Sequence, residues 1–460
     1  MNTKNLTSGH IPTQVRNIAL PASIGLIFQT MYNVVDSFYA GQISTLALAA
    51  LGLSFPVYLL IIATSGGLSR GASALIANAI GSNDDEKKSR YIAQSISMGI
   101  VVSICVSITG FLAAASLFQL LGASGEYLSI ALEYMNPIFA GAIFFVINNL
   151  SNAILIAHGD SKTFSKVLTV GFFLNLILDP WFLYGGFGLP ALGIAGIAWA
   201  TVVIQVLGCA FMFSTVLRRG LVDLTPIRKL LPDIRVYLEI ARQALPATSA
   251  IMSVALGFFA TTYFLKFFGE PTVAAFGVTT RIEQMGLLPT FGFYSAIMAL
   301  VGQNNGAQKY DRIHETMRVC NRTAMVLILT TSVLQLVFAK QLMGIFTSDP
   351  EVIDLGVLCL YIIAPVQWSY VITSTHLAML QAMKKPMYGF FESISRKVLL
   401  PVPFFILCVW HYKMGVDSVW YSIAGTNVFA TVVTLTYARW VLRRIPKSVD
   451  EKTSDEKTSD

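Results

Sequence analysis

The sequence predicts an all-α membrane protein with twelve transmembrane helices in two pseudo-symmetric six-helix bundles. Three observations predict this fold class. Hydrophobic residues make up 55% of the chain and charged residues 12%, and this charged share is about half that of an average soluble domain. Apolar segments long enough to cross a bilayer recur from one end of the chain to the other. The second half of the chain also repeats the first, position by position.

The apolar segments predict helices rather than strands. Each is long enough to supply the roughly 20 residues that a helix needs to cross ~30 Å of hydrocarbon, and lipid offers no hydrogen-bond partner to an open backbone. The alternating segments of about ten residues that a membrane barrel would need are absent. In chain order the twelve segments lie near residues 14–40, 46–80, 92–121, 127–157, 166–187, 191–217, 238–268, 273–304, 316–346, 352–382, 388–410 and 418–442.

The two halves are related by one constant offset, which places Pro21 on Pro246. Small residues and prolines keep this register without a gap from Ala19 to Gly81. The matched words are Ala19-Leu20-Pro21-Ala22 with Ala244-Leu245-Pro246-Ala247, and the matched glycines are Gly52, Gly67 and Gly81 with Gly277, Gly292 and Gly306. Internal repeats of this kind are characteristic of secondary transporters, which move one half against the other around a central site.

The repeat predicts an N-terminal lobe at residues 1–217 and a C-terminal lobe at residues 238–445. Residues 218–237, which contain Pro226 and Pro232, are predicted to form a cytoplasmic linker. The tail at residues 446–460 repeats its own pentapeptide Glu-Lys-Thr-Ser-Asp, and we expect it to be disordered. Because the duplication supplies both halves in one chain, a functional monomer is expected.

Basic residues orient the helices. The alternate loops hold almost none apart from Lys266 and Lys413, whereas the even-numbered segments are followed by Lys87, Lys88, Arg90, Lys162, Lys166, Arg218, Arg219, Arg228, Lys229, Arg235, Lys309, Arg312, Lys384, Lys385, Arg443, Arg444 and Lys447. Under the positive-inside rule both termini are cytoplasmic, in the inner (plasma) membrane. The net charge of +7 is therefore a topology signal, and no nucleic-acid partner is expected.

Acidic residues at membrane depth are expensive and suggest function. Asp36 lies in the first segment, where Gln29, Tyr32 and Asn33 precede it at helical spacing and form one polar stripe with it. The equivalent position in the second half is Thr261, so this acid belongs to the first half only. Pro21 predicts a hinge earlier in the same helix.

Asp179 in the fifth segment is the second such acid. Asn175 lies four residues before it and therefore shares its helix face. Pro180 follows immediately, removes a backbone hydrogen bond and crowds the carbonyl group of Leu176. This arrangement predicts a hinge beside a titrating group.

Amide and hydroxyl side chains are predicted to surround the two acids. Asn149 and Asn152 lie in the fourth segment and Thr201 in the sixth, and such groups can hydrogen-bond a carboxyl in either protonation state. Two nearby acids would titrate as a coupled pair, which could carry a proton across the membrane. The alternative is a helix-to-helix hydrogen bond that only holds the bundle together.

Other ionisable residues at membrane depth are interpreted as structural, although some could line a path. They are an Arg281/Glu283 pair, a Glu392/Arg396/Lys397 set expected near the cytoplasmic end of its helix, and the lone His376. The five cysteines lie singly in apolar segments without Cys/His metal spacing. No metal centre and no cofactor are predicted.

The chain resembles the multidrug and toxic compound extrusion (MATE) transporters throughout, except in the tail. The resemblance is carried by Leu20-Pro21 and by the stretches Asn33–Gly41 (NVVDSFYAG), Asn175–Pro180 (NLILDP) and Gly302–Ala307 (GQNNGA). It implies two six-helix bundles and an antiporter that exports varied, often cationic, compounds against inward cation flow. Within the family the chain is similar to the prokaryotic branch whose coupling acids lie in the N-terminal lobe.

Residue by residue, the resemblance implies that Asp36, Asn175 and Asp179 are the cation-linked positions. It also implies that Gln29, Tyr32, Asn149 and Asn152 are their neighbours, and that Pro21 is linked to bending. Another branch carries sodium-associated acids in the seventh and tenth helices, where this chain has Gly257–Thr262 without an acid and His376 without a mid-segment acid. This departure favours protons, although carboxylate and amide oxygens of the N-terminal lobe could also hold sodium.

We therefore expect a proton-coupled exporter of small-molecule drugs, with sodium coupling as an alternative. A lipid-linked sugar flippase of the wider superfamily is a second alternative, but it would more often line its cavity with basic side chains, and only Arg70 and Arg281 are deep enough here. A membrane-embedded enzyme is not expected, because no hydrolase or metalloprotease motif occurs.

Overall fold

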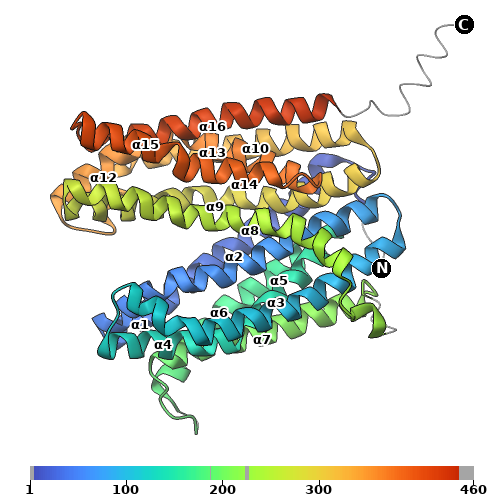
Figure 1. The fold of residues 1–460 in the computed structure, drawn as a ribbon, viewed down its shortest axis with the longest axis horizontal. Coiled ribbons are helices and arrows are strands. Elements are labelled where there is room, and N and C mark those ends of the chain that lie inside the picture. The colour runs from blue at the N-terminus through green and yellow to red at the C-terminus, as the bar shows by residue number, and fades with distance from the viewer. Residues whose placement is uncertain (1–4, 187, 223–226, 445–460) are drawn as a thin grey trace, which may run out of the picture. The chain divides into compact units, whose positions relative to one another are not determined.

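The computed structural model describes residues 5–186, 188–222 and 227–444 (Figure 1). The helices of the first half are α1 (Ile11–Ile43), α2 (Thr45–Gly81), α3 (Asp85–Leu120), α4 (Gly125–Ala140), α5 (Ala142–Ala157), α6 (Lys162–Tyr184) and α7 (Ile194–Arg218). They are followed by η1 (Ile227–Leu230), α8 (Ile234–Leu265), η2 (Lys266–Phe268), α9 (Glu270–Gly306), α10 (Tyr310–Val337), α11 (Ala339–Gly344), α12 (Pro350–Ile363), η3 (Ala364–Val366), α13 (Gln367–Ala382), α14 (Met387–Ile394), η4 (Ser395–Leu399), α15 (Pro401–Phe405), η5 (Ile406–His411) and α16 (Asp417–Arg443).

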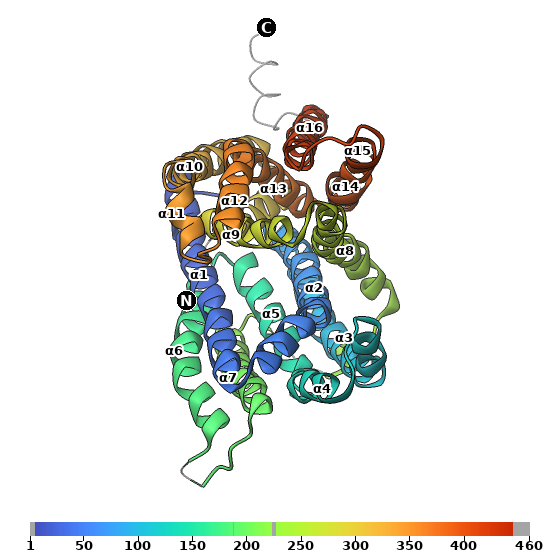
Figure 2. The same ribbon diagram turned by 90° about the vertical axis from the view of Figure 1, so that its left-hand side faces the viewer.

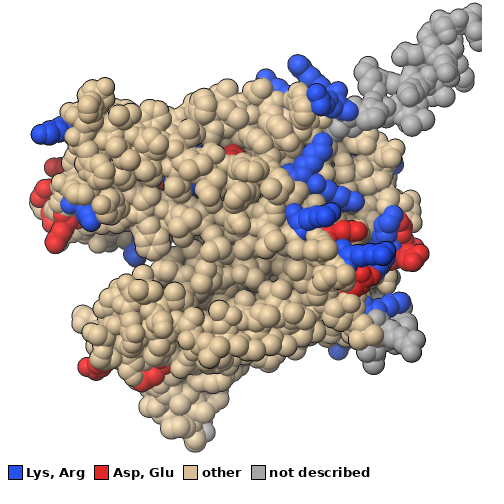
Figure 3. All heavy atoms as spheres, viewed as in Figure 1, with Lys and Arg blue, Asp and Glu red and all other residues tan. Residues whose placement is uncertain are grey.

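The helices confirm the predicted fold class. In the described part of the chain, eleven helices or continuous helical runs are long and apolar enough to cross a membrane, and α4 with α5 can add a twelfth span that is bent by 49°. This bend falls at Gly141, where an added Cβ would lie 2.8 Å from a methyl group of Val202, so a close approach of α7 accounts for the glycine. The charged side chains visible in Figure 3 gather near the ends of the helices, and the surface between them is almost uncharged.

Contacts divide the chain into two compact units. The first unit contains Ile24–Thr248, and the second contains Leu6–Ser23 together with the residues from Ser249 onward. The predicted lobes differ from these units in two places, because the beginning of α1 belongs to the second unit and the beginning of α8 to the first. Residues 223–226 of the predicted linker and the predicted tail lie outside the described residues.

Two glycines explain why the beginning of α1 belongs to the second unit and the beginning of α8 to the first. In the first unit Gly67 of α2 packs so closely on α8 that an added Cβ would lie 1.9 Å from Thr248 Oγ1 and 2.7 Å from its backbone nitrogen. In the second unit Gly292 of α9 packs in the same way on α1, where a Cβ would lie 2.1 Å from the Ala19 carbonyl oxygen and 2.3 Å from Ser23 Oγ. These glycines are repeat partners, and so are the residues they meet.

The repeat also fixes the turns between helices. Asn83 and Gln308, repeat partners after α2 and α9, both have positive φ values, of 54° and 58°. The residue after each donates its backbone N–H to a carbonyl oxygen of the preceding helix. Asp84 donates to Ala79, and Lys309 donates to Asn304. Such a bond satisfies a carbonyl group that the helix end leaves free. The sequence repeat therefore reflects two shared features of the halves: the helix ends have the same geometry, and the helices pack on one another at equivalent glycines.

The predicted linker is anchored on the first unit through α3. The Gln94 side chain donates to the carbonyl oxygens of Lys229 and Leu231 and accepts from the N–H of Asp233. The Arg90 guanidinium, which pairs with Asp233, holds the pKa of that carboxyl below its ordinary value. The stability that the Arg90–Asp233 ion pair contributes is fully present when the pH is above the ordinary pKa of an aspartate. It is lost as the pH falls through the lowered pKa of Asp233.

The second unit places its last helices side by side. Figure 2 shows α14 and α15 next to α16, and α15 is in contact with α16. The span from Met387 to His411 is not a regular α-helix, because η4 and η5 within it are π-helical. Single π-helical turns inside α-helices are frequent at functional sites.

The close crossings give a test of the fold. Gly67→Ala and Gly292→Ala are expected to lower the melting temperature, because a methyl group forced into a packed contact costs about 1–3 kcal/mol. Gly52→Ala and Gly277→Ala are the matched controls, since an added Cβ there meets no atom within 4 Å. These controls should keep or raise the melting temperature, because alanine favours a helix over glycine. Thermal melting of the purified variants in detergent is the measurement, and equal melting temperatures for all four would contradict these packing contacts.

Candidate coupling site in the first unit

The two acids predicted to carry function are joined through one amide. Asn175 Nδ2 donates to Asp36 Oδ1 at 2.9 Å and to Asp179 Oδ1 at 2.7 Å. All three side chains are buried in the first unit, and Asn175 and Asp179 have no exposed surface. A primary amide has two N–H donors, so these two bonds use all that Asn175 can donate. The site is thus an acid pair bridged by a fully engaged amide.

Close packing of α1 on α6 brings the pair together. At Gly25 of α1 an added Cβ would lie 3.0 Å from the Ser165 Cα of α6, and farther along the two helices the rings of Phe28 and Phe172 lie 5.5 Å apart. Asp36 and Asn175 follow in the same order, so the two helices run parallel here. The register of α1 against α6 is therefore set by three contacts in order: a small residue, an aromatic pair and a polar contact.

Several buried polar atoms of the first unit, two of them in the amide-bridged acid pair, lack a hydrogen-bond partner. In the described residues, the buried side-chain atoms without a hydrogen-bond partner include Asn148 Oδ1, Asn152 Oδ1, Asn175 Oδ1 and Asp179 Oδ2, all of the first unit. Buried polar groups are almost always paired, so a concentration of unpaired ones needs an explanation. These atoms are acceptors, and bound protons or a cation would satisfy them.

The acids also lack a fixed counter-charge. Among the ion pairs of the described residues, none includes Asp36 or Asp179. Two ionised carboxylates without a cation are costly in a low-dielectric interior. The arrangement can therefore take up positive charge reversibly, either as protons or as a monovalent cation held by carboxylate, amide and hydroxyl oxygens.

The structure places the predicted neighbours at different distances from the pair. Thr201 interacts with both Asp36 and Tyr32, and Tyr32 is close enough to Asp36 to feel its charge. Asn152 is buried, whereas Asn149 is half-buried and donates to the Phe145 carbonyl oxygen of its own helix. The side chains of Gln29 and Asn33 are exposed.

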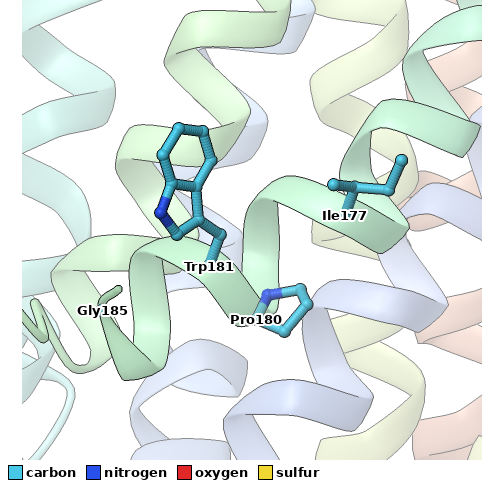
Figure 4. A pocket seen from close by; sticks show the side chains of 4 residues that line it. All are labelled: Ile177, Pro180, Trp181 and Gly185. Carbon is cyan, nitrogen blue, oxygen red and sulfur yellow. The ribbon is translucent and has the colours of Figure 1, made fainter. Parts of the chain in front are cut away.

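The predicted hinge residues lie inside unbroken helices, Pro21 in α1 and Pro180 in α6. Pro180 lines a shallow pocket with Ile177, Trp181 and Gly185 (Figure 4). Ile177 and Trp181 are exposed on the outer face of α6, and the pocket does not contain the acids. The Pro180 ring thus lies at the surface while the adjacent Asp179 carboxyl is buried.

In the second unit the structure changes two interpretations. Arg281 is exposed and does not pair with Glu283, which instead faces Lys397, Tyr370 and Arg396. Residues two apart on a helix do not face each other, and this explains the separation. Lys397 was also expected near a helix end, but it lies in the middle of its span. His376 donates to the Ile372 carbonyl oxygen at 2.7 Å, as a satisfied polar residue should.

Comparisons with known proteins agree with this architecture. The family model named MatE matches twice, at residues 21–181 and 246–407, once in each half. A probable multidrug resistance protein NorM from Thermotoga maritima is 26% identical over 95% of this chain and 94% of its own length. An FAD transporter from Shewanella oneidensis is 25% identical over 98% of both chains.

A solved structure has the same fold. It is a MOP superfamily transporter from Pyrococcus furiosus, described with a binding pocket of reverse polarity that suggests a different function. It aligns with a TM-score of 0.90 and 28% identity over 97% of this chain and 100% of the other. The resemblance seen in the sequence is confirmed: the chain belongs to the MatE family, whose members are membrane transporters and not enzymes.

Proposed function

We propose that this protein is a cation-coupled antiporter, with protons as the coupling ion, that exports small and often cationic drugs. The observation that carries the proposal is the acid pair itself, because two buried carboxyls share one amide and have no counter-charge. Ionisable groups at membrane depth are rarely kept for packing alone. The multidrug relative supports drugs as the substrate class.

In the proposed cycle the acid pair exchanges protons for substrate. Facing outward, Asp36 and Asp179 take up protons, which bind carboxylate oxygens such as the unpaired Asp179 Oδ2. A protonated carboxyl donates where it formerly accepted, so the bonds around Asn175 rearrange and α1 shifts against α6. This shift reduces the space for substrate and releases it, and the protons leave on the cytoplasmic side.

The proton gradient is strong enough for this work. One pH unit supplies about 1.4 kcal/mol per proton, and 100 mV adds ~2.3 kcal/mol per charge. Together they support a roughly 500-fold concentration ratio for each proton exchanged with an uncharged substrate. One or two protons therefore suffice for efflux.

The orientation follows from the basic residues of the cytoplasmic loops. We place the protein in the inner membrane as a multi-pass monomer, with both termini in the cytoplasm. The substrate range is set by the shape of an apolar cavity rather than by a motif. Because one relative is an FAD transporter, an anionic nucleotide belongs in the substrate panel beside cationic drugs.

Sodium coupling is the main alternative, because the carboxylate and amide oxygens of Asp36, Asn175 and Asp179 are ligands that a hard cation accepts. A flippase for lipid-linked sugars is less favoured, since the site is acidic rather than basic. Each alternative predicts a different response to ions and substrates.

Reconstituted vesicles test the proposal. The purified protein in proteoliposomes with an imposed pH gradient should move protons when a cationic drug is added, as read by a pH-sensitive dye, with equal rates in sodium and in choline buffers. A response that appears only with sodium would assign sodium as the coupling ion. No response to any drug in the panel would contradict the antiporter.

A further inference from the structure

The second unit holds a cluster of charged side chains that the coupling mechanism does not use. It consists of Glu283 on α9, Tyr370 on α13, Glu392 on α14, Arg396 and Lys397 on η4, and Asn427 on α16. All six residues belong to the second unit. Three of the four charged residues lie in the span Met387–His411, and the fourth, Glu283, meets them from α9.

The cluster lies deep in the membrane. Lys397 lies near the middle of its apolar span, Met387–His411, well away from both ends. Glu283 lies several helical turns from either end of α9. Charged side chains at this depth are rare, and each is a candidate functional residue whose partner should be identified.

One half of the cluster is fully paired. Arg396 Nε donates to Glu392 Oε1 at 2.5 Å, and Arg396 Nη1 donates to Asn427 Oδ1 at 3.0 Å. Asn427 Nδ2 in turn donates to the Tyr370 hydroxyl oxygen at 2.9 Å, and this leaves the Tyr370 O–H to donate to Glu283. The paired half is thus a rigid support that holds Tyr370 in place.

The other half contains no ion pair within salt-bridge distance among the described residues. Lys397 and Glu283 attract each other, but among the ion pairs of the described residues none includes either of them. The Lys397 ammonium lies 5.0 Å from the centre of the Tyr370 ring. An ammonium with three donors and a carboxylate are therefore held near each other without being closed into a salt bridge.

The backbone keeps Lys397 where it is. An added Cβ at Gly257 of α8 would lie 2.9 Å from the Lys397 Cβ and 2.9 Å from its carbonyl oxygen. Lys397 also belongs to the π-helical segment η4, next to the fully engaged Arg396. Its backbone is therefore fixed, and only the long side chain can move toward a ligand.

We propose that Glu283 and Lys397 form a substrate subsite for zwitterions, that is, for molecules that carry an acidic and a basic group. The Lys397 ammonium binds the carboxylate or phosphate of such a substrate, Glu283 binds its protonated amine, and the Tyr370 ring packs on its apolar part. This proposal rests on the proposed export function and assigns two residues of the second unit to the binding of one class of its substrates.

A pair of probes that differ in one charge tests the subsite. Ciprofloxacin carries a carboxylate and a protonated amine, and its methyl ester keeps only the amine. The purified wild-type protein should bind the acid at least tenfold more tightly than the ester, by quenching of tryptophan fluorescence. If the ester binds as tightly as the acid, the proposal is wrong, and this outcome depends on no variant.

Variants then assign the charges. Lys397→Met should weaken binding of the acid about tenfold and change binding of the ester less than twofold, Lys397→Arg should keep the preference for the acid, and Glu283→Gln should weaken both probes. Lys340→Met, at an exposed lysine of α11 in the same unit, is the matched control and should change neither. Equal effects of Lys397→Met on both probes would overturn the assignment.

Failure of this proposal can be distinguished from failure of the proposed function. Asp36→Asn should lose drug-evoked proton movement while keeping the preference for the acid over the ester. A loss of that preference in Asp36→Asn but not in Lys397→Met would move the subsite to the first unit and overturn the proposal for Glu283 and Lys397.

Discussion

Asp36→Asn should abolish the dependence of drug export on the proton gradient. An amide cannot release a proton, and it no longer supplies the negative charge that draws a proton into the site. For an uncharged drug, the ratio of its concentrations across the membrane should fall from a roughly 500-fold limit per proton toward equality. Binding of the drug should persist, because the substitution keeps the shape of the side chain and the site retains Asn175 and Asp179.

Everted vesicles that hold a respiratory proton gradient give the measurement, with drug-evoked proton movement as the readout. Asp85→Asn is the matched control, since that carboxyl lies exposed in the first turn of α3 and outside the acid pair. It should behave as wild type at equal abundance in the membrane. Full dependence on the gradient in Asp36→Asn would refute the role assigned to this acid.

Asn175→Leu should slow export by at least tenfold. The substitution removes both N–H donors that bridge the acids, and a hydrogen bond to a charged group contributes about 1.5–3 kcal/mol. Without these donors the ionised forms of Asp36 and Asp179 lose their stabilisation, so the pair holds its protons and does not exchange them. Export should therefore recover in part when the pH is raised on both sides.

Asn33→Leu is the corresponding control, because it makes the same change on α1 at an exposed side chain. It should reduce export much less, and its pH profile should match that of wild type. Initial rates of drug uptake into everted vesicles at several pH values measure both effects. An Asn175→Leu profile that is lowered uniformly without a pH shift would indicate a purely structural role for the amide.

Local patterns predicted much of this account. The spacing of Asn175 and Asp179 puts both on one face of α6, and the structure joins them by a hydrogen bond. The matched words around Pro21 and Pro246 predicted a duplication, and the crossings at Gly67 and Gly292 give the physical reason for it.

Contacts distant in the sequence were beyond the reach of local patterns. Asp36 and Asn175 are 139 residues apart, and no spacing or periodicity in the sequence shows that they meet. The exchange of the beginnings of α1 and α8 between the units was not predicted either, because a hydropathy pattern does not say which bundle a helix end joins. Lys397 was expected near the cytoplasmic end of its helix, whereas it lies in the middle of its span and its charge faces Glu283 on another helix.

The most direct test of the central claim is a count of the protons exchanged when substrate binds. Calorimetry of a cationic drug binding to the purified protein, in two buffers of different ionisation enthalpy, gives the number of protons released per drug bound. The acid pair predicts a release of between about one and two protons in wild type, none in Asp36→Asn/Asp179→Asn, and no change when sodium replaces choline. Binding without proton release in wild type, or release that survives the double substitution, would contradict coupling through Asp36 and Asp179.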